Sequence, residues 1–342
     1  MPSTLKELSR LAGVHPSTVA RVLNADPRQR VSDEVRDRIV ALAHEHGYQP
    51  NSLARSLRTK RSYVIGTLIP DISNPFFAAM FRGVEDLLAR HDFNVILANT
   101  DDDPVREQRS LDMLQGRQVD GLLLATARRH DPAVARLAAQ HVPFVLVNRH
   151  TEPLAANAVV PDDYGGAASA VEHLASLGHR RIAHIAASDF TSTGHDRRRG
   201  YDAALRRLGL PIDDALVVTG SFREQGGYDA MRALLARPDP PTAVFAVNDL
   251  AASGALRAIR DCGLQSPHDV SVVGFNDLSF ALGTTPRLTT LHVPLHAMGV
   301  AAAERLLAVI GGQEVMEPVV LPVELICRES TGPAPARTRL AG

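Results

Sequence analysis

The stretch from Thr4 to Asn24 reads TLKELSRLAGVHPSTVARVLN and holds two short helical patterns joined by a tight turn. Gly13 suits the left-handed end of the first helix, and Pro16 suits the first turn of the second, where its missing N–H has no partner. Helical spacing predicts one apolar face on the first helix, made by Leu5, Leu8, Leu11 and Ala12. The second helix, from Pro16 to Asn24, turns Val19 inward in the same way.

A third helix is predicted over about residues 32–47, with Ser32 as its cap and Gly47 at its end. Two short helices with a four-residue turn and then a third helix form a helix-turn-helix pattern. In that pattern the second helix enters the DNA major groove, where Arg21 can donate two hydrogen bonds to a guanine edge. Ser17 and Thr18 can reach bases or phosphates. The alternative is a small helical bundle on which these side chains are merely solvated.

Charge is divided unevenly along the 342 residues, although the net charge is only −1. The first 62 residues hold 11 Lys and Arg against 6 Asp and Glu, and the remainder hold 26 against 32. A basic head of net +5 on an acidic body of net −6 favours contact between the head and nucleic acid. The length itself favours more than one domain.

Residues 48–62 read YQPNSLARSLRTKRS, with four basic side chains within seven residues. Asn51 could cap a short helix whose apolar side contains Leu57, and such a helix could order on DNA and place Leu57 in a minor-groove base step. A basic flexible linker without a helix explains the same residues equally well.

From residue 63 onward, short apolar runs alternate with helix-length amphipathic segments, which predicts buried parallel sheets with right-handed crossovers. Some ten strands in about 280 residues are too many for one six-stranded sheet, so we expect two lobes. The strands are expected at residues 63–70, 94–100, 121–126, 144–148, 158–161, 181–187, 216–220, 243–247 and 271–275.

Ligands of open parallel sheets bind beyond the carboxyl ends of the strands, so the polar and aromatic residues there are candidates. An Asn or Asp in this position is often only a turn residue, but the pattern recurs at five or six strand ends. Amide, carboxylate and guanidinium groups beside aromatic faces suit a polyhydroxylated ligand, because each hydroxyl both donates and accepts. The candidates are Asp71, Asn74, Phe76, Phe77, Asn148, Arg149, Arg197, Phe222, Asn248 and Asn276.

The N-terminal stretch resembles the DNA-binding head of the LacI/GalR family of bacterial transcription regulators, and YQPNSLARSL resembles its hinge helix. The resemblance implies base-reading positions at Pro16, Ser17 and Arg21, and an intercalating Leu57 flanked by Ala54 and Arg58. Two residues depart from the family, since His15 and Ala20 stand where it usually has serine. The DNA-binding residues predicted on both grounds are His15, Pro16, Ser17, Thr18, Arg21, Asn24, Ala54, Leu57 and Arg58.

Segments of the body, among them DISNPFF, VDGLLL, TAVFAVND and DVSVVGFND, resemble the periplasmic-binding-protein-like sensor of the same regulators and ribose-type sugar-binding proteins. The resemblance implies a ring-clamping loop at Asn74, Phe76 and Phe77, with Arg149, Arg197, Phe222 and Asn248 as further ligand contacts. Asn148 and Asn276 stand where those sugar binders usually carry aspartate, which leaves the identity of the sugar open. Two lobes joined by three crossings are also implied, with a return to the first lobe near His292.

We therefore expect an all-α helix-turn-helix head and an α/β body with two doubly wound parallel sheets. The expected divisions are a head at 1–48, a hinge at 49–62, a sensor and dimerisation body at 63–332 and a disordered tail at 333–342. The function expected is a homodimeric repressor on a pseudo-palindromic DNA operator, controlled by a small effector. A sugar is expected first and a nucleoside or purine second. Release of DNA by the effector is expected, and the opposite sign stays open.

Other classes of protein are less consistent with the sequence. A stand-alone sugar-binding transport protein should have a signal peptide and no basic head, whereas the N-terminus lacks an apolar signal region and predicts a cytoplasmic protein. No apolar run is long enough to span a membrane. An enzyme would need a nucleophile or metal set, and neither Asp101–Asp103 nor the pair His195 and Asp196 has suitable spacing. We expect no catalytic activity, no metal and no cofactor, and the tail has no leucine heptads for tetramerisation.

Overall fold

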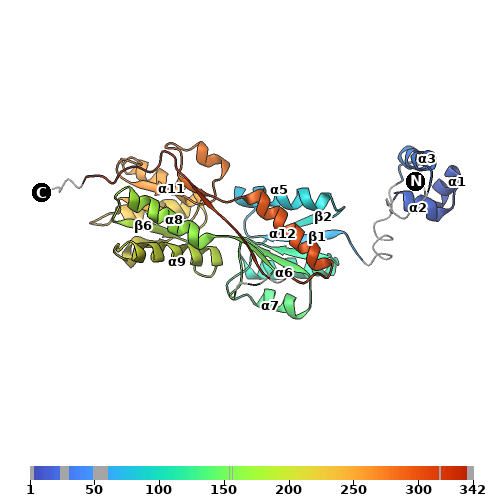
Figure 1. Ribbon diagram of the computed structural model, residues 1–342, viewed down its shortest axis with the longest axis horizontal. Coiled ribbons are helices and arrows are strands. Elements are labelled where there is room, and N and C mark those ends of the chain that lie inside the picture. The colour runs from blue at the N-terminus through green and yellow to red at the C-terminus, as the bar shows by residue number, and fades with distance from the viewer. Residues whose placement is uncertain are drawn as a thin grey trace. The chain divides into compact units, whose positions relative to one another are not determined.

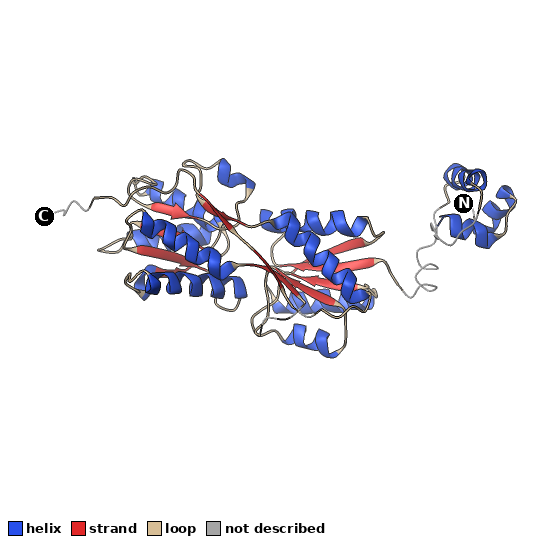
Figure 2. Ribbon diagram, viewed as in Figure 1, coloured by secondary structure: helices blue, strands red, loops and turns tan. Residues whose placement is uncertain are grey.

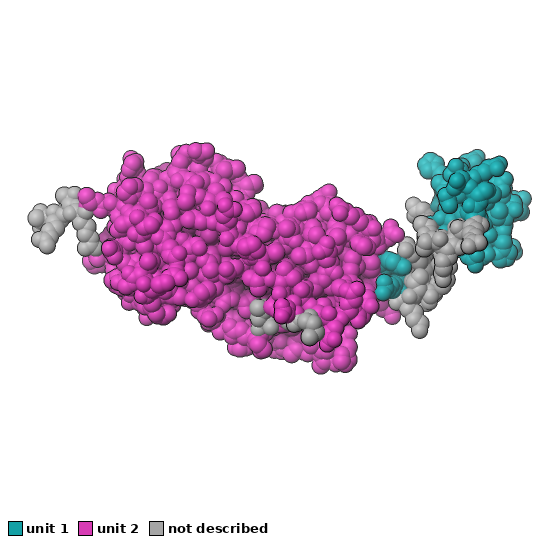
Figure 3. Space-filling view, in the orientation of Figure 1, with its two compact units in different colours: residues 1–63 teal, residues 64–342 magenta. Residues whose placement is uncertain are grey.

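The computed structural model describes residues 4–23, 31–48, 61–153, 155, 157–315 and 317–336. The chain divides into two compact units, residues 1–63 and 64–342 (Figure 3). The hinge predicted at 49–62 lies outside the described residues except for its last two. Asn24, Ala54, Leu57, Arg58 and the final six residues of the predicted tail also lie outside them.

The first unit contains three helices, α1 (Leu5–Ala12), α2 (Pro16–Leu23) and α3 (Asp33–Glu45). The Thr4 hydroxyl accepts from the Glu7 N–H at the start of α1, and the Ser32 hydroxyl accepts from the Val35 N–H at the start of α3. Gly13 takes a φ of 65°, as expected for the end of α1. The helix-turn-helix expectation is therefore confirmed.

The core of this unit is made by Leu8, Ala12, Val19, Ile39 and Ala43. The expectation that Leu11 belongs to the buried face of α1 was wrong, because Leu11 is 40% exposed and Ser9 is buried instead. At 100° per residue, Ser9 completes an arc with Leu5, Leu8 and Ala12, whereas Leu11 falls outside it. The Ser9 hydroxyl is satisfied by donating to the Lys6 carbonyl at 2.7 Å.

The second unit has two lobes, each built on a parallel sheet covered by helices on both faces (Figure 1). The sheet of the first lobe has the order β11-β5-β4-β3-β1-β2. Its strands are β1 (Val64–Ile69), β2 (Asn94–Asn99), β3 (Gly121–Leu124), β4 (Phe144–Val147), β5 (Ala158–Pro161) and β11 (Val319–Leu321). Its helices are α5 (Pro75–Ala89), α6 (Pro104–Gly116), α7 (Pro132–Ala139) and α12 (Leu295–Ile310).

The second lobe has a four-stranded sheet of order β7-β6-β8-β9. Its strands are β6 (Ile182–Ala186), β7 (Val217–Thr219), β8 (Ala243–Ala246) and β9 (Ser271–Val273). Its helices are α8 (Asp163–Ser176), α9 (Ser192–Arg207), α10 (Glu224–Leu235) and α11 (Asp249–Asp261), with 3-10 turns at Asp214–Leu216 and Ser279–Leu282. The strand order reverses between β1 and β3 in one sheet and between β6 and β8 in the other, which places ligands beyond the strand ends at these points.

Three crossings join the lobes, one after β5, one after β10 (Thr290–His292) and one between β11 and β12 (Glu324–Ile326). β10 and β12 pair antiparallel where the lobes meet (Figure 2). After β10 the chain returns to the first lobe, where α12 packs against α5 and the sheet. All nine strands predicted from the sequence are present. β10, β11 and β12 were missed because they do not follow the alternation of strand and helix, since β10 and β12 form an antiparallel pair at the crossings and no helix separates β11 from β12.

Candidate functional site

The N-terminal end of α2 exposes the residues that the sequence assigned to DNA. Ser17, Arg21 and His15 are exposed, while Pro16 and Thr18 are half-buried. The His15 ring caps the helix in place of the usual serine, because its Nδ1 accepts from the Ser17 N–H at 3.2 Å and lies 2.7 Å from the Ser17 hydroxyl. With Nδ1 accepting from this N–H, the neutral ring carries its proton on Nε2.

A cavity of about 230 Å³ lies between the two lobes of the second unit. All ten candidate ligand residues predicted from the sequence line this one cavity. Asp71, Asn74, Phe76, Phe77, Asn148 and Arg149 come from the first lobe, and Arg197, Phe222, Asn248 and Asn276 come from the second. The two groups meet because the carboxyl ends of both sheets face the cleft.

Aromatic side chains form the apolar part of the cavity wall. The rings of Phe76 and Phe77 lie edge to face, with centroids 5.1 Å apart. Asn74 positions them, because its side chain caps α5 by accepting from the Phe76 N–H at 3.1 Å. Phe222 contributes from the opposite lobe. Flat apolar faces of this kind suit the C–H surfaces of a sugar ring.

Asn148 and Asn276 provide unused hydrogen-bonding capacity in the same cavity. Both side chains are buried, and among the described residues neither carboxamide oxygen has a hydrogen-bond partner. Both residues have a positive φ, 65° for Asn148 and 117° for Asn276. An orphaned buried acceptor is costly unless a ligand or water satisfies it. These two oxygens therefore mark positions where donor groups of a ligand fit.

Arg149 is buried and is held by a residue that the sequence analysis did not assign to the site. Its guanidinium donates to both carboxylate oxygens of Asp102, at 2.6 and 3.3 Å, and lies over the Phe222 ring at 5.8 Å from the centroid. Asp102 also lines the cavity. The sequence analysis considered Asp101–Asp103 only as a metal set and rejected it, and the signal available was their position directly after the second strand.

Arg197 is 2% exposed, and internal partners already occupy much of its guanidinium. Nε and Nη2 both lie 2.7 Å from Asp163 Oδ1, and Nη1 donates to the Val247 carbonyl. The group also lies 3.7 Å from the centroid of the Phe275 ring. Burial raises the pKa of Asp163 to about 6, although Arg197 opposes the shift. Arg197 thus has a structural role that sequence alone did not indicate.

Asn248 and Asp249 lie together at the start of α11. The Asn248 side chain caps the helix by accepting from the Ala251 N–H at 2.8 Å and donates to the Phe222 carbonyl at 2.9 Å. Asp249 accepts from the Thr290 hydroxyl at 2.5 Å and from the Leu278 N–H at 2.7 Å. Burial raises the pKa of Asp249 to about 7. The helix start is therefore tied both to the cavity wall and to the crossing strand β10.

Several further residues line the cavity that the sequence analysis did not select. Arg223 is one of them, and it forms an ion pair of 2.9 Å with Asp71 from the other lobe. It followed Phe222 directly in the chain, but nothing in the local pattern indicated its partner. The remaining residues are Pro70, Asp101, Ala187, Ser188, Phe190, Thr193, Gly220 and Ser221.

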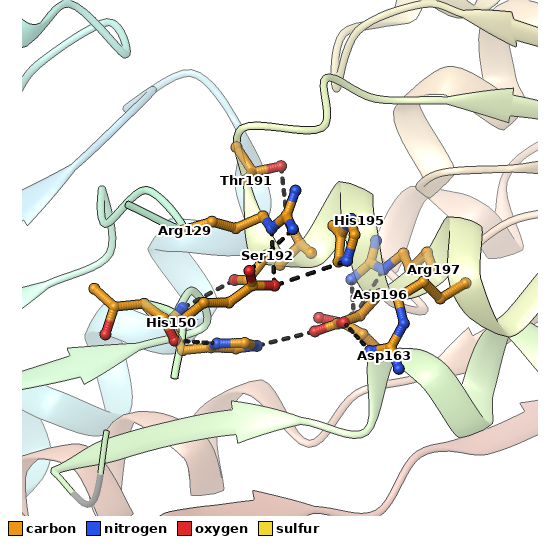
Figure 4. Close-up of polar contacts among 12 residues, drawn as sticks. Arg129, His150, Asp163, Thr191, Ser192, His195, Asp196 and Arg197 are labelled. Carbon is orange, nitrogen blue, oxygen red and sulfur yellow. Dashed lines mark hydrogen bonds and ion pairs between the residues drawn. The ribbon is translucent and has the colours of Figure 1, made fainter. Parts of the chain in front are cut away.

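His195 and Asp196 are neighbours in sequence but have different hydrogen-bond partners in the structure. His195 pairs with Asp189, whereas Asp196 pairs with His150 (Figure 4). The described residues contain no group of three or more His, Cys, Asp or Glu side chains arranged so that they could hold a metal ion. Within the same ranges, no helix is long and apolar enough to cross a membrane.

Comparison with known families matches both parts of the chain. Residues 4–51 match the family of bacterial regulatory proteins of the lacI type. Residues 62–329 match the family described as periplasmic binding proteins and sugar binding domain of the LacI family. The second match alone covers more than half of the chain.

Individual relatives agree with these matches. The ribose operon repressor of Escherichia coli strain K12 is 38% identical over 308 residues, covering 89% of this chain and 92% of that protein. The structure of the lac repressor dimer bound to operator and the anti-inducer ONPF has a TM-score of 0.87 at 27% identity, covering 97% of this chain and all of that one. A LacI family regulator from Enterococcus faecium with bound ribose has a TM-score of 0.71 at 33% identity, covering 79% and 99%.

The relatives are transcriptional regulators rather than enzymes. The helix-turn-helix unit, the two-lobed body and the matches over both lead to one conclusion. The chain belongs to the LacI family of bacterial regulatory proteins and is a DNA-binding transcriptional regulator.

Proposed function

We propose that this regulator is a repressor whose affinity for its operator is lowered by a small, neutral, polyhydroxylated effector, with a monosaccharide of the pentose class first. The cavity between the lobes is its binding site, and the body has no catalytic role. The proposed divisions are a head at 1–48, a hinge at 49–62, a body at 63–332 and a tail at 333–342. The protein acts as a homodimer on a pseudo-palindromic site.

The observation that carries this proposal is the pair of unsatisfied carboxamide oxygens of Asn148 and Asn276 beside the Phe76 and Phe77 rings. Hydroxyl groups can donate to both oxygens while the ring stacks on the aromatic faces. The ribose-bound relative and the ribose operon repressor favour the same class of ligand.

The charges of the cavity also favour a neutral ligand. Its three arginines already have carboxylate partners, in the pairs Arg149–Asp102, Arg197–Asp163 and Arg223–Asp71. An anionic ligand would have to compete with these carboxylates, and a cationic ligand would have to displace an arginine. The buried Nε of Arg149 has no hydrogen-bond partner among the described residues, so it is a donor left for a ligand hydroxyl.

The size of the cavity favours a monosaccharide over a nucleoside or purine derivative, which remains the second candidate. Its volume of about 230 Å³ is below the roughly 300–1,000 Å³ that is usual for drug-sized ligands.

For the head, we propose that α2 enters the major groove, with Pro16, Ser17 and Arg21 facing bases and His15 and Thr18 near the backbone. Asn24, Ala54, Leu57 and Arg58 stay predicted contacts outside the described residues.

A thermal-shift screen of the full chain with D-ribose, other pentoses, hexoses and nucleosides tests the effector proposal. A stabilising sugar should then weaken binding to operator DNA. Stabilisation by a nucleoside alone would replace the sugar with the second candidate. No response to any of these compounds would overturn the sensor assignment.

A further inference from the structure

A group of charged side chains connects the two lobes beside the cavity (Figure 4). From the first lobe, Arg129 follows β3, and His150 and Glu152 follow β4. From the second lobe come residues after β6 and on α9, namely Asp189, Ser192, His195 and Asp196. We call these seven residues the latch.

Arg129 is the centre of the latch and is only 17% exposed. Its Nε and Nη2 donate to the two carboxylate oxygens of Glu152, both at 2.9 Å, which fixes the plane of the guanidinium. Its Nη1 donates across the cleft to the Asp189 carboxylate at 2.7 Å. The Arg129 N–H also crosses the cleft and donates to the Phe190 carbonyl at 3.0 Å. Nη1 donates to the Asp189 carbonyl as well, at 3.1 Å, so this one residue makes three hydrogen bonds with the opposite lobe.

Both histidines of the latch also bridge the lobes. His195 Nδ1 lies 2.6 Å from Asp189, and its Nε2 lies 3.7 Å from Glu152 of the first lobe. His150 Nε2 lies 2.9 Å from Asp196 of the second lobe. The His150 N–H donates to the Ser192 hydroxyl, also at 2.9 Å.

The charges that face the latch histidines include both signs, and those around His150 favour its protonated form. The carboxylates of Glu152, Asp189 and Asp196 lie within the latch, and Asp163 at the start of α8 acts on His150 from further away. Four positive groups lie nearby. Arg129 is in the latch, and Arg199 pairs with Asp196 along α9. The other two are His130 and the buried Arg197. Burial lowers the pKa of His150, but the hydrogen bonds with Asp196 and the Thr151 carbonyl raise it by more, so the net shift of this pKa is upward.

The latch is continuous with the cavity wall. Asn148 and Arg149 line the cavity and directly precede His150. In the second lobe, Phe190 and Thr193 line it between latch residues, and Arg197 directly follows the last of them. Opening the latch would separate these two walls.

We propose that the latch is a set of positioning residues that holds the lobes closed over the cavity before any effector binds, and that His150, which meets Asp196 across the cleft, takes up a proton as the latch closes. A fall in pH therefore closes the cleft and strengthens effector binding. The proposal rests on the proposed function only in placing the effector in this cavity.

Hydrogen exchange of the full chain without ligand tests the latch directly. The Arg129 and His150 amides bond across the cleft, so their exchange reports opening, and amides of β3 report general unfolding. After correction for the intrinsic effect of pH, the two latch amides should exchange more slowly at pH 6 than at pH 8, because the closed state binds the proton on His150 more tightly. Equal protection at both pH values would overturn the proton-linked part.

Matched variants separate the latch from ordinary structural loss. Arg129→Gln should speed exchange at the His150 amide roughly tenfold. Arg198→Gln is the control. Among the described residues, Arg198 on α9 forms ion pairs with Asp202 and Asp214, and both of these belong to its own lobe. The same effect in both variants would overturn the latch. If Arg129→Gln also speeds exchange in β3, the double variant His150→Gln and His195→Gln provides the test. It should remove the pH dependence of exchange at the latch while leaving β3 protected. A retained pH dependence would overturn the proposal.

The last measurement repeats the hydrogen exchange in the presence of D-ribose at saturating concentration. Slower exchange at the latch amides and around Phe77 would show that the sugar closes the same cleft. No change anywhere with ribose would count against the pentose proposal, whereas the ligand-free results would still decide the latch.

Discussion

Arg197 and Asp163 form an ion pair of 2.7 Å in which the two side chains are only 2% and 5% exposed. The position of Arg197 beyond a strand end and the family resemblance both indicated that it is a ligand contact. The structure shows that its guanidinium also satisfies a buried carboxylate, so a substitution here acts on folding as well as on the cavity.

Arg197→Ala should therefore lower the free energy of unfolding by about 3–5 kcal/mol, because it leaves the Asp163 charge buried without its partner. Urea denaturation measures this loss. Arg198→Ala is the control, since its ion pairs are more exposed and should be worth about 1 kcal/mol or less. A similar small loss in both variants would contradict the structural role of Arg197.

Asp249 should make the stability of the body depend on pH. Its pKa is about 7 in the folded chain against an ordinary value of 3.8, so the folded state binds the proton more tightly. The stabilisation is complete below pH 4 and is lost as pH rises towards 7. Asp249→Asn should reduce the decline between pH 5 and 7.5 by about 1 kcal/mol or more, because asparagine stays neutral. The free energy of unfolding, measured by urea denaturation across this pH range, checks the prediction. An equal decline in the parent chain and in the variant would refute it.

Asn276→Gly should weaken effector binding without changing operator binding in the absence of effector. The variant removes one of the two unpartnered acceptors, and glycine accepts the φ of 117° at this position. The loss expected is about 1–3 kcal/mol for a sugar whose hydroxyl uses that oxygen. Isothermal titration with the sugar found in the thermal-shift screen measures it. Unchanged affinity would remove Asn276 from the ligand site.

Arg21→Ala should have the opposite pattern, with effector binding intact and base discrimination reduced by about 1–3 kcal/mol if the contact with guanine is bidentate. Competition between operator variants, measured at fixed salt, distinguishes lost discrimination from a uniform loss of affinity. A uniform loss across all sequences would assign Arg21 to phosphate instead.

His15→Ala should weaken operator binding by about 0.5–2 kcal/mol, because the start of α2 loses its cap. His15→Ser should recover most of the loss, since a hydroxyl can accept from the same backbone N–H. Operator titration of the two variants checks the role of the ring. Equal binding by the alanine and serine variants would show that capping is not what His15 contributes.

Local signals in the sequence determined much of this protein. Gly13, Pro16 and Ser32 mark helix ends through backbone geometry that depends on neighbouring residues only. The alternation of apolar runs with helical segments predicted nine strands, and the rule that ligands lie beyond strand ends predicted which residues meet in the cavity. Resemblance to the family added the order of the parts.

Only the tertiary structure decided the partners of those residues. Asp102 pairs with Arg149, Asp71 pairs with Arg223, and Arg129 reaches Asp189, although each pair is far apart in sequence. Periodicity shows which face of an element is buried, but it carries no information on which distant side chain lies opposite. The partner of each side chain depends on how the strands are ordered within a lobe and on how the two lobes close on each other. It separates the residues that are free to meet a ligand from those already engaged with the protein itself.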